Sequence, residues 1–380
     1  MLKRDIQYLD LIYKCCNVLA VSPSYNFEKN VIIYPLMCKI YGFVLVSFLI
    51  LSGTLSAYEI MQIYVSHKKK VTTFFIVEIF NSCCLIAETA AMILSSSLLN
   101  QENWLKMNRN LQFFDNKLAT KNVQSRTLLK NAYCRFFTIF LLYLIFNFYV
   151  NYTIYKLSPV VLLTTAYWLH LICNLCEFYM CFLIYNIMVA LRHRYEDLNQ
   201  LLQFHVLPEN PTSHIREISD LWMILHDTVT YCNRIFGWPL IFFSGRAVLQ
   251  LLQSLEVTVI ILNKNFTVPE KDQTRRLALT NFIIFAYIWI CMIFVIMSCD
   301  SVASESRITA EMCFKMQKCF PDNSNERREL LWLANETSVN IVRFTAAEFF
   351  EINRGTVFGI LSTTTTYFII IVQFKNIGQN

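Results

Sequence analysis

The chain has 380 residues, of which 55% are hydrophobic and 16% are charged, with a formal net charge of +6. Soluble domains carry about 25% charged residues, so this composition excludes an ordinary water-soluble domain. Only 7 glycines and 8 prolines are present, which disfavours a string of domains joined by flexible linkers. The basic residues are spread along the chain, which disfavours a nucleic-acid-binding face.

Seven long apolar segments follow an N-terminal stretch, residues 1–33, which Asp5, Asp10 and Lys14 interrupt too often for a secretory signal. A hydrocarbon core of about 30 Å takes about 20 helical residues to cross, and each segment is long enough. Backbone groups inside lipid must bond within their own segment, so continuous apolar runs predict helices rather than barrel strands. We therefore predict an all-α, seven-transmembrane helical bundle with spans at 34–58, 72–98, 131–156, 158–191, 237–262, 279–299 and 355–375.

The distribution of Lys and Arg predicts the orientation of these spans. With the N-terminus inside, the inner segments hold 21 such residues and the outer segments hold 9, which favours a cytoplasmic N-terminus and an extracellular C-terminus. The basic run His67–Lys70 falls in a predicted outer segment, which opposes this orientation. All 14 cysteines fall in spans or inner segments, which fits a reducing compartment. Sequons at Asn151 and Asn265 fall in outer segments and are possible glycosylation sites.

The inner segments are longer than the outer ones and contain helical patterns of their own. Apolar residues recur at i, i+3 and i+4 in 196–203 and 221–236, and the fourth span is long enough to continue beyond the lipid. We predict a cytoplasmic helical anchor; helices lying on the lipid surface are the alternative. The predicted division is 1–33, a cytoplasmic segment; 34–299, the first six spans with extended cytoplasmic helices; 300–354, an anchor segment; and 355–380, the last helix with an extracellular tail.

Ionisable side chains within the spans are candidates for function, because an unpaired charge in lipid costs several kcal/mol. Three of them, Glu78, His170 and Glu256, are predicted to line a ligand cavity. The four others are Glu88, Arg135, Glu177 and Arg246. Aromatic walls with a few polar groups are typical of small-molecule pockets, and pairing across helices is the structural alternative. The residues predicted to line a cavity open to the outside are Glu78, Tyr167, Trp168, His170, Glu256, Tyr287 and Trp289.

No catalytic or metal-binding pattern is found in the sequence. It contains no HExxH, GxSxG or phosphate-binding loop motif. Cys173 and Cys176 form a lone C-x-x-C within an apolar span, which indicates small buried hydrophobes rather than a metal site. We expect neither an enzyme nor a cofactor or metal.

The last span has an unusual polar character, because residues 362–374 read STTTTYFIIIVQF. On a helix, Thr363, Thr366, Ile370 and Gln373 fall on one stripe. Such a stripe could line a water-filled pore if several copies surrounded an axis. It could equally pack against other helices, with the threonines bonding back to the i−4 carbonyl.

The sequence resembles the insect gustatory receptor family, chiefly in its C-terminal half. Residues 366–374, TYFIIIVQF, are similar to the Tyr-to-Gln-Phe signature that closes members of this family. The approach to the last helix at 344–367, the sequence NRIFG at 233–237 and RHRYEDLNQLL at 192–202 also resemble it.

The resemblance implies a tetrameric, tastant-gated, non-selective cation channel in the plasma membrane of sensory neurons. Its partners would be a small-molecule tastant, the lipid bilayer, and identical or sibling subunits. Sugar-sensing members carry an acidic residue where Phe368 stands, so a bitter-type or orphan receptor is favoured. The implied pore-lining residues are Thr363, Thr366, Tyr367, Ile370, Gln373 and Phe374.

Three rival classes differ from this interpretation. An odorant-receptor-type ligand-gated channel would share the architecture. A G-protein-coupled receptor would have the opposite orientation and the motifs Asp-Arg-Tyr and Asn-Pro-x-x-Tyr, which are missing here. A transporter would show internal repeats or Gly/Pro-broken helices.

Overall fold

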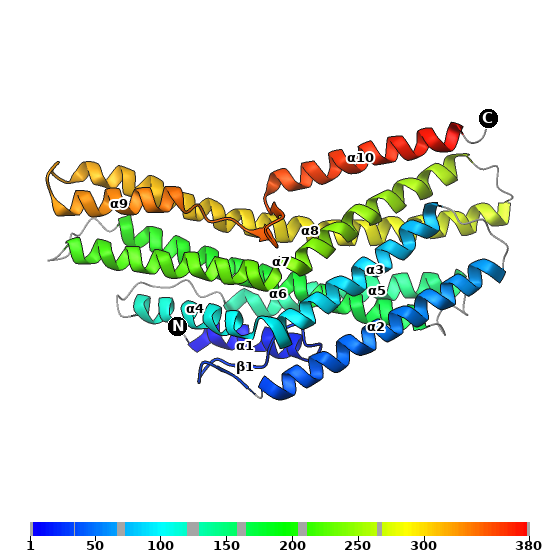
Figure 1. The fold of residues 1–380 in the computed structure, drawn as a ribbon, viewed down its shortest axis with the longest axis horizontal. Coiled ribbons are helices and arrows are strands. Elements are labelled where there is room, and N and C mark those ends of the chain that lie inside the picture. Colours follow the sequence, from blue (N-terminus) through cyan, green and yellow to red (C-terminus); the bar gives the residue numbers. More distant parts are fainter. Residues whose placement is uncertain are drawn as a thin grey trace.

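A computed structural model describes residues 3–33, 35–66, 73–119, 129–157, 165–203, 211–263 and 268–377 (Figure 1). The described chain is almost entirely helical, as the composition predicts. Its elements in chain order are α1 (Lys3–Asn17), β1 (Tyr25–Asn26), β2 (Val31–Ile32), α2 (Pro35–Ser66), α3 (Thr73–Leu94), η1 (Ser95–Leu99), α4 (Gln101–Ala119), α5 (Leu129–Leu157), α6 (Thr165–Gln203), α7 (Pro211–Asn263), α8 (Val268–Met316), η3 (Gln317–Cys319), α9 (Asn325–Val339), β3 (Thr345–Ala346), β4 (Phe350–Glu351) and α10 (Arg354–Ile377).

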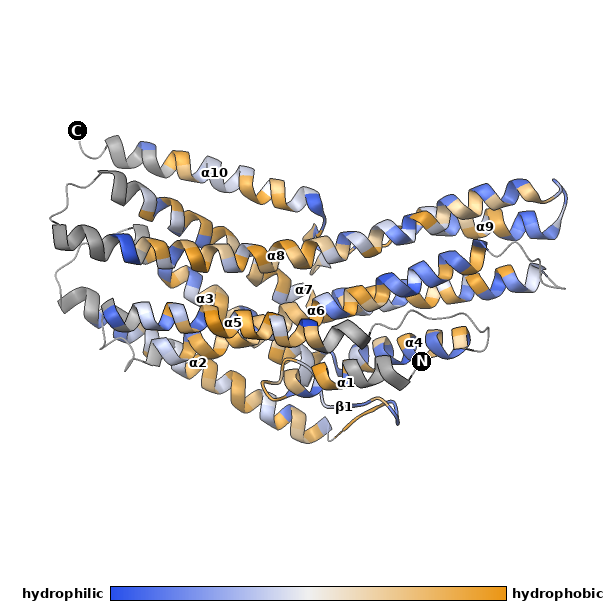
Figure 2. Ribbon diagram, turned by 180° about the vertical axis from the view of Figure 1, so that it is seen from behind, coloured by the Kyte–Doolittle hydropathy of each residue, from blue (hydrophilic) through white to orange (hydrophobic). Residues whose placement is uncertain are grey.

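The molecule is long, with an apolar half and a more polar half (Figure 2). Within the described residues, six helices are long and apolar enough to cross a membrane: α2, α3, α5, α6, α7 and α8. Over the seventh predicted span lies α10, whose 24 residues extend about 36 Å. The helix α2 exposes apolar side chains on several sides, among them Leu36, Phe43 and Leu51, as expected for a helix surrounded by lipid and protein. The predicted seven-helix architecture is therefore confirmed.

The polar half is a base built mainly from helices that continue out of the apolar half. The helices α6, α7 and α8 have 39, 53 and 49 residues, far more than a bilayer needs. The helical patterns predicted at 196–203 and 221–236 are parts of α6 and α7 rather than separate helices. In Figure 1 the helices α4 and α9 complete the base, and α1 lies beside it.

Packing in the base follows from amphipathic periodicity. The helix α4 buries Trp104, Met107, Leu111, Phe114 and Leu118, which recur every three or four residues and form one stripe. It packs mainly on α7.

Polar contacts in the base fix how its helices are paired. Arg194 of α6 is paired with Asp115 of α4 at 2.6 Å, and both side chains are largely buried. In α1, burial raises the pKa of Tyr13 well above its usual value, so its hydroxyl stays protonated and donates to Asn108 Oδ1 at 3.0 Å. These contacts position the ends of the membrane helices.

Two irregular connections join the halves. The π-turn η1 forms an elbow between α3 and α4, and its three serines are buried. The antiparallel hairpin β3–β4 joins the base to α10.

The helix α7 changes direction between its base and apolar halves, as Figure 1 shows, and Pro239 stands inside this helix. Neither this change of direction nor the two connections were predicted from the sequence.

Candidate functional site

A buried ion pair lies between α6 and α7 in the apolar half. Arg246 of α7 pairs with Glu177 of α6, and these residues are 4% and 2% exposed. The Arg246 guanidinium also donates to Asn174 Oδ1 at 2.8 Å. A buried ion pair persists only where such additional bonds compensate for lost hydration.

A second carboxylate, Glu88 of α3, lies close enough to Arg246 for the two charges to attract. Glu88 is 1% exposed, and neither of its carboxylate oxygens has a hydrogen-bond partner within the described parts of the chain. Glu88 therefore adds a second carboxyl group near a guanidinium whose charge Glu177 already balances. A proton, water or a polar ligand group would satisfy the oxygens of Glu88.

A chain of side-chain amides extends the polar region across three helices. Asn81 of α3 donates to Gln250 of α7 at 2.9 Å, and Gln250 donates to Asn281 of α8 at 2.6 Å. Asn81 Oδ1 and Asn281 Nδ2 are buried without a partner within the described residues. The polar cluster, defined here as Glu88, Asn81, Asn174, Glu177, Arg246, Gln250 and Asn281, thus retains unused hydrogen-bonding capacity.

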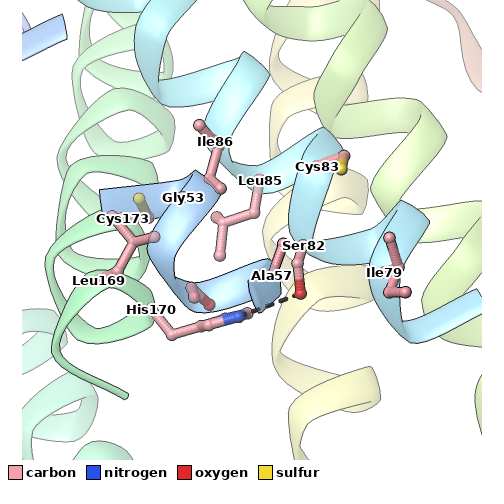
Figure 3. A pocket seen from close by; sticks show the side chains of 11 residues that line it. Gly53, Ala57, Ile79, Ser82, Cys83, Leu85, Ile86, Leu169, His170 and Cys173 are labelled. Atoms are coloured by element: carbon pink, nitrogen blue, oxygen red, sulfur yellow. Dashed lines mark hydrogen bonds between the residues drawn. The ribbon is translucent and has the colours of Figure 1, made fainter. Parts of the chain in front are cut away.

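A small cavity opens between α2, α3 and α6 (Figure 3). The side chain of His170 points at Ser82, with 3.1 Å between Nε2 and Oγ, and Ser56 adds a third polar group to the lining. The cavity of about 30 Å³ matches the share of one water molecule, whereas ligand pockets typically hold about 300–1,000 Å³. In this conformation the cavity fits water, and a larger ligand would require the helices to separate.

The predicted ligand-binding residues have different surroundings within the described part of the chain. Only His170 lines the cavity in Figure 3. Tyr287 stacks on Phe146 of α5 at 4.6 Å, and the Trp289 indole donates to Ala247 O at 3.2 Å, which fits packing between helices. The other four are distributed as follows: Trp168 is 56% exposed, Tyr167 packs edge-on against it, Glu78 is half-buried and Glu256 is buried.

The remaining sequence predictions have mixed outcomes. Cys173 and Cys176 are both buried, as small hydrophobes would be. Asn151 is half-buried within α5, whereas Asn265 and the run His67–Lys70 lie outside the described residues.

The helix α10 lies along the outside of the bundle (Figure 1). Its Thr364 is fully buried, and Val357 and Ile360 pack against the main core from the same side of the helix. The stripe of Thr363, Thr366, Ile370 and Gln373 is exposed and points the opposite way.

Aromatic side chains beside the stripe on α10 are also exposed, and one threonine hydroxyl of the stripe bonds within the helix. Tyr367 and Phe358 are 56% and 71% exposed. Thr366 bonds back to the Ser362 carbonyl at 3.0 Å, so its hydroxyl proton is satisfied within the helix and its methyl and lone pairs face outward. The side chain of Phe374 lies outside the described residues.

Comparison with known proteins gives the family. A model of the family described as 7tm chemosensory receptor matches residues 9–377. Gustatory receptor 68a of Drosophila melanogaster is 24% identical over 199 residues, which cover 51% of this chain and 50% of the relative. Putative gustatory receptor 28a of the same species is 28% identical over 174 residues, which cover 45% of this chain and 37% of that relative. The chain thus spans half or less of the length of these curated relatives.

Solved structures confirm the fold. The insect olfactory receptor OR5 from Machilis hrabei superposes with a TM-score of 0.58 at 10% identity, covering 88% of this chain and 89% of that one. The same receptor in complex with eugenol gives a TM-score of 0.58 at 11% identity, covering 98% of both chains. These structures share the overall fold of this chain, and the matched family is one of receptors rather than enzymes. Since the family model spans nearly the whole sequence, the chain belongs to the 7tm chemosensory receptor family.

Proposed function

We propose that this chain is a subunit of a tastant-gated, non-selective cation channel of the gustatory receptor type. The outward stripe of α10, made of Thr363, Thr366, Ile370 and Gln373, carries the proposal. This face is turned away from the chain's own bundle, yet it carries the Gln373 amide, which lipid would leave without partners, and threonine lone pairs that the bonds within the helix do not use. Water at the axis of a ring of subunits, four by the family resemblance, satisfies these groups.

The polar cluster is the proposed place where ligand binding is sensed. The unpartnered oxygens of Glu88 and the unused amide atoms of Asn81 and Asn281 can bond to polar ligand groups or to water that a ligand displaces. His170 and Ser82 offer a second polar contact at the edge of the bundle. A ligand that binds the open form more tightly than the closed form shifts the population towards the open channel.

The taste class follows from Phe368, which is half-buried on α10 where sugar-sensing members carry an acidic residue. A carboxylate there would be partly desolvated, whereas Phe368 adds apolar contact. We therefore propose a bitter-type or orphan receptor. With the orientation given by the basic residues, it would lie in the plasma membrane of sensory neurons, with Asn151 and Asn265 on the outer side.

Substitution of Gln373 tests the proposed pore. Gln373→Ala removes the amide that would contact permeating ions, so ion selectivity or single-channel conductance should change while surface expression stays intact. The matched control is Thr364→Ser, because Thr364 is buried against the bundle and keeps its hydroxyl. Voltage clamp with bitter compounds and sugars supplies the currents, and unchanged permeation in Gln373→Ala would remove this residue from the pore.

An odorant-receptor-type channel is the second candidate, because the matching solved structures are olfactory receptors. Both candidates share the pore and differ in ligand. Activation by volatile compounds alone, with no response to bitter compounds or sugars, would favour the odorant type.

A further inference from the structure

The turn of α7 from Asn233 to Pro239 is bonded on one side to the elbow between α3 and α4. Proline has no N–H, so the carbonyl of Ile235, four residues earlier, loses its helical donor. The hydroxyl of Ser95 replaces that donor at 2.6 Å. The side chain of Asn100 donates to the neighbouring carbonyl of Arg234 at 3.0 Å. The inner end of α3 is therefore attached to the kink in α7.

The same turn of α7 is bonded to the hairpin β3–β4. The Asn233 side chain donates to Arg343 O at 2.8 Å and accepts from Thr345 N–H at 3.1 Å, so one amide bonds to the hairpin twice. Gly237 allows the hairpin to come close, since a Cβ built there would lie 2.7 Å from the backbone nitrogen of Ala347. The rings of Trp238 and Phe349 meet beside this contact at 6.1 Å.

The turn of the hairpin is held in a strained backbone conformation. Ala347 and Glu348 have φ values of 43° and 66°, a region in which residues with a Cβ are unfavourable. In hairpin turns, two successive residues with positive φ are usually asparagine and glycine rather than alanine and glutamate. Such strain persists only where surrounding contacts enforce it, and here the contacts come from α7.

The hairpin leads directly into α10. Asn353 caps the helix by accepting from Thr356 N–H at 3.2 Å, and Arg354 pairs with Asp300 of α8 at 2.6 Å. Beyond this inner end, most of α10 is exposed. The position of α10 is therefore set largely where the hairpin meets α7.

We infer that Asn233 is a positioning residue for α10, through which displacements of the α3 elbow and the α7 kink reach the last helix. The bonds of Ser95 and Asn100 connect α3 to the turn of α7. The two bonds of Asn233 then connect that turn to the hairpin, which leads into α10. Glu88 lies two turns from the elbow on α3, and Arg246 lies two turns from Pro239 on α7, so the polar cluster borders both elements. The consequence for current rests on the proposed channel function, whereas the consequence for the position of α10 does not.

The test measures the exposure of α10 in the full-length receptor in membranes. A Thr366→Cys reporter is modified by a charged methanethiosulfonate reagent, and the chain without the reporter gives the background from exposed native thiols such as Cys134. Asn233→Ala should change the reporter's modification rate by about fivefold, as expected when a two-state equilibrium loses one typical hydrogen bond. Asn233→Asp, which keeps the acceptor for Thr345 N–H, should give an intermediate rate.

Asn199→Ala is the matched control. Like Asn233, which is half-buried, the buried Asn199 makes two bonds between elements, to Glu305 O at 3.1 Å and from Thr309 at 2.7 Å, but it lies in the base between α6 and α8. It should lower thermal stability and leave the reporter rate unchanged. Equal changes in both variants would overturn the inference, because they would indicate general loosening.

A second pair of variants keeps the test decisive if Asn233→Ala does not fold. Gly237→Ala adds a methyl group against the hairpin backbone, whereas Gly245→Ala on the same helix meets only Cys84 Sγ at an ordinary 3.8 Å. Only Gly237→Ala should alter the reporter rate, and an unchanged rate would overturn the inference. Sodium current recorded in parallel on the variants without the Thr366→Cys reporter, with bitter compounds and sugars applied, separates the two ideas: a shifted reporter without current in any of these variants contradicts the channel and supports the coupling.

Discussion

Arg246 is the residue on which the membrane half depends most. It is 4% exposed and balances the charge of Glu177, while Glu88 lies nearby without a hydrogen-bond partner within the described residues. Removing one partner of a buried ion pair is costly, because the charge left behind can reach neither water nor a counter-ion. The cluster therefore makes the packing of α3, α6 and α7 depend on one guanidinium.

Arg246→Met should destabilise the receptor by about 3–5 kcal/mol, since it leaves Glu177 buried and unpaired. The double variant Arg246→Met/Glu177→Gln should recover much of this loss. Thermal unfolding of the purified receptor measures both. Arg307→Gln in the base part of α8 is the control, because Arg307 is exposed outside the apolar half and its replacement should change stability by less than about 0.5 kcal/mol. Equal stability of Arg246→Met and the native chain would contradict this account.

At the residue scale, the sequence identified Glu88, Glu177 and Arg246 as charged groups within spans but could not show that they are neighbours. Membrane helices are apolar on the lipid side and on the protein side, so periodicity does not reveal which face turns inward. For the same reason, the place of Tyr287 and Trp289 in a ligand cavity stays a prediction. The stripe on α10 was predictable, because its polar groups contrast with the apolar residues around them.

The helix α2 crosses η1 closely at Gly42. A Cβ built on Gly42 would lie 2.0 Å from Ser97 Oγ and 2.5 Å from Ser97 Cβ, so no side chain fits there without movement. At Gly53, about three turns further along α2, the atom nearest to a built Cβ is the flexible end of Ile86 at 2.9 Å.

Gly42→Ala should therefore destabilise the receptor by about 1–3 kcal/mol through overpacking, and Gly53→Ala should cost less, because Ile86 can change rotamer. Adding Ser97→Gly to Gly42→Ala should restore part of the stability. Melting temperatures of the three variants decide the point, and an equal cost at both glycines would show that the crossing is looser than described.

At the element scale, the seven spans and the extension of the fourth span beyond the lipid were predictable from hydropathy and length. The continuity of α7 and α8 into the base was not, because their charged inner halves lose the apolar signal while the helix continues. The hairpins were also missed. Each has strands of two residues, so the pairing of the strands depends on tertiary contacts such as the bonds of Asn233 to the hairpin β3–β4.

At the scale of the whole molecule, the proposed assembly of several chains rests on the exposure of α10. Its contact with the bundle is a narrow line through Val357, Ile360 and Thr364, and the apolar residues Phe358 and Ile369 on its flanks are exposed. Lipid can cover those flanks, but it would leave the Gln373 amide on the stripe without hydrogen-bond partners. Several chains arranged with this stripe towards a common axis satisfy both requirements.

Cross-linking between copies at Gln373 tests this arrangement most directly. The full-length receptor carrying Gln373→Cys would be treated in membranes with a short bifunctional thiol reagent and separated by mass, with the unsubstituted chain as the background for native thiols. Helices that meet at a central axis should give products of two, three and four linked chains that the unsubstituted chain lacks. Only single chains, at full modification of the introduced thiol, would contradict a pore formed by α10.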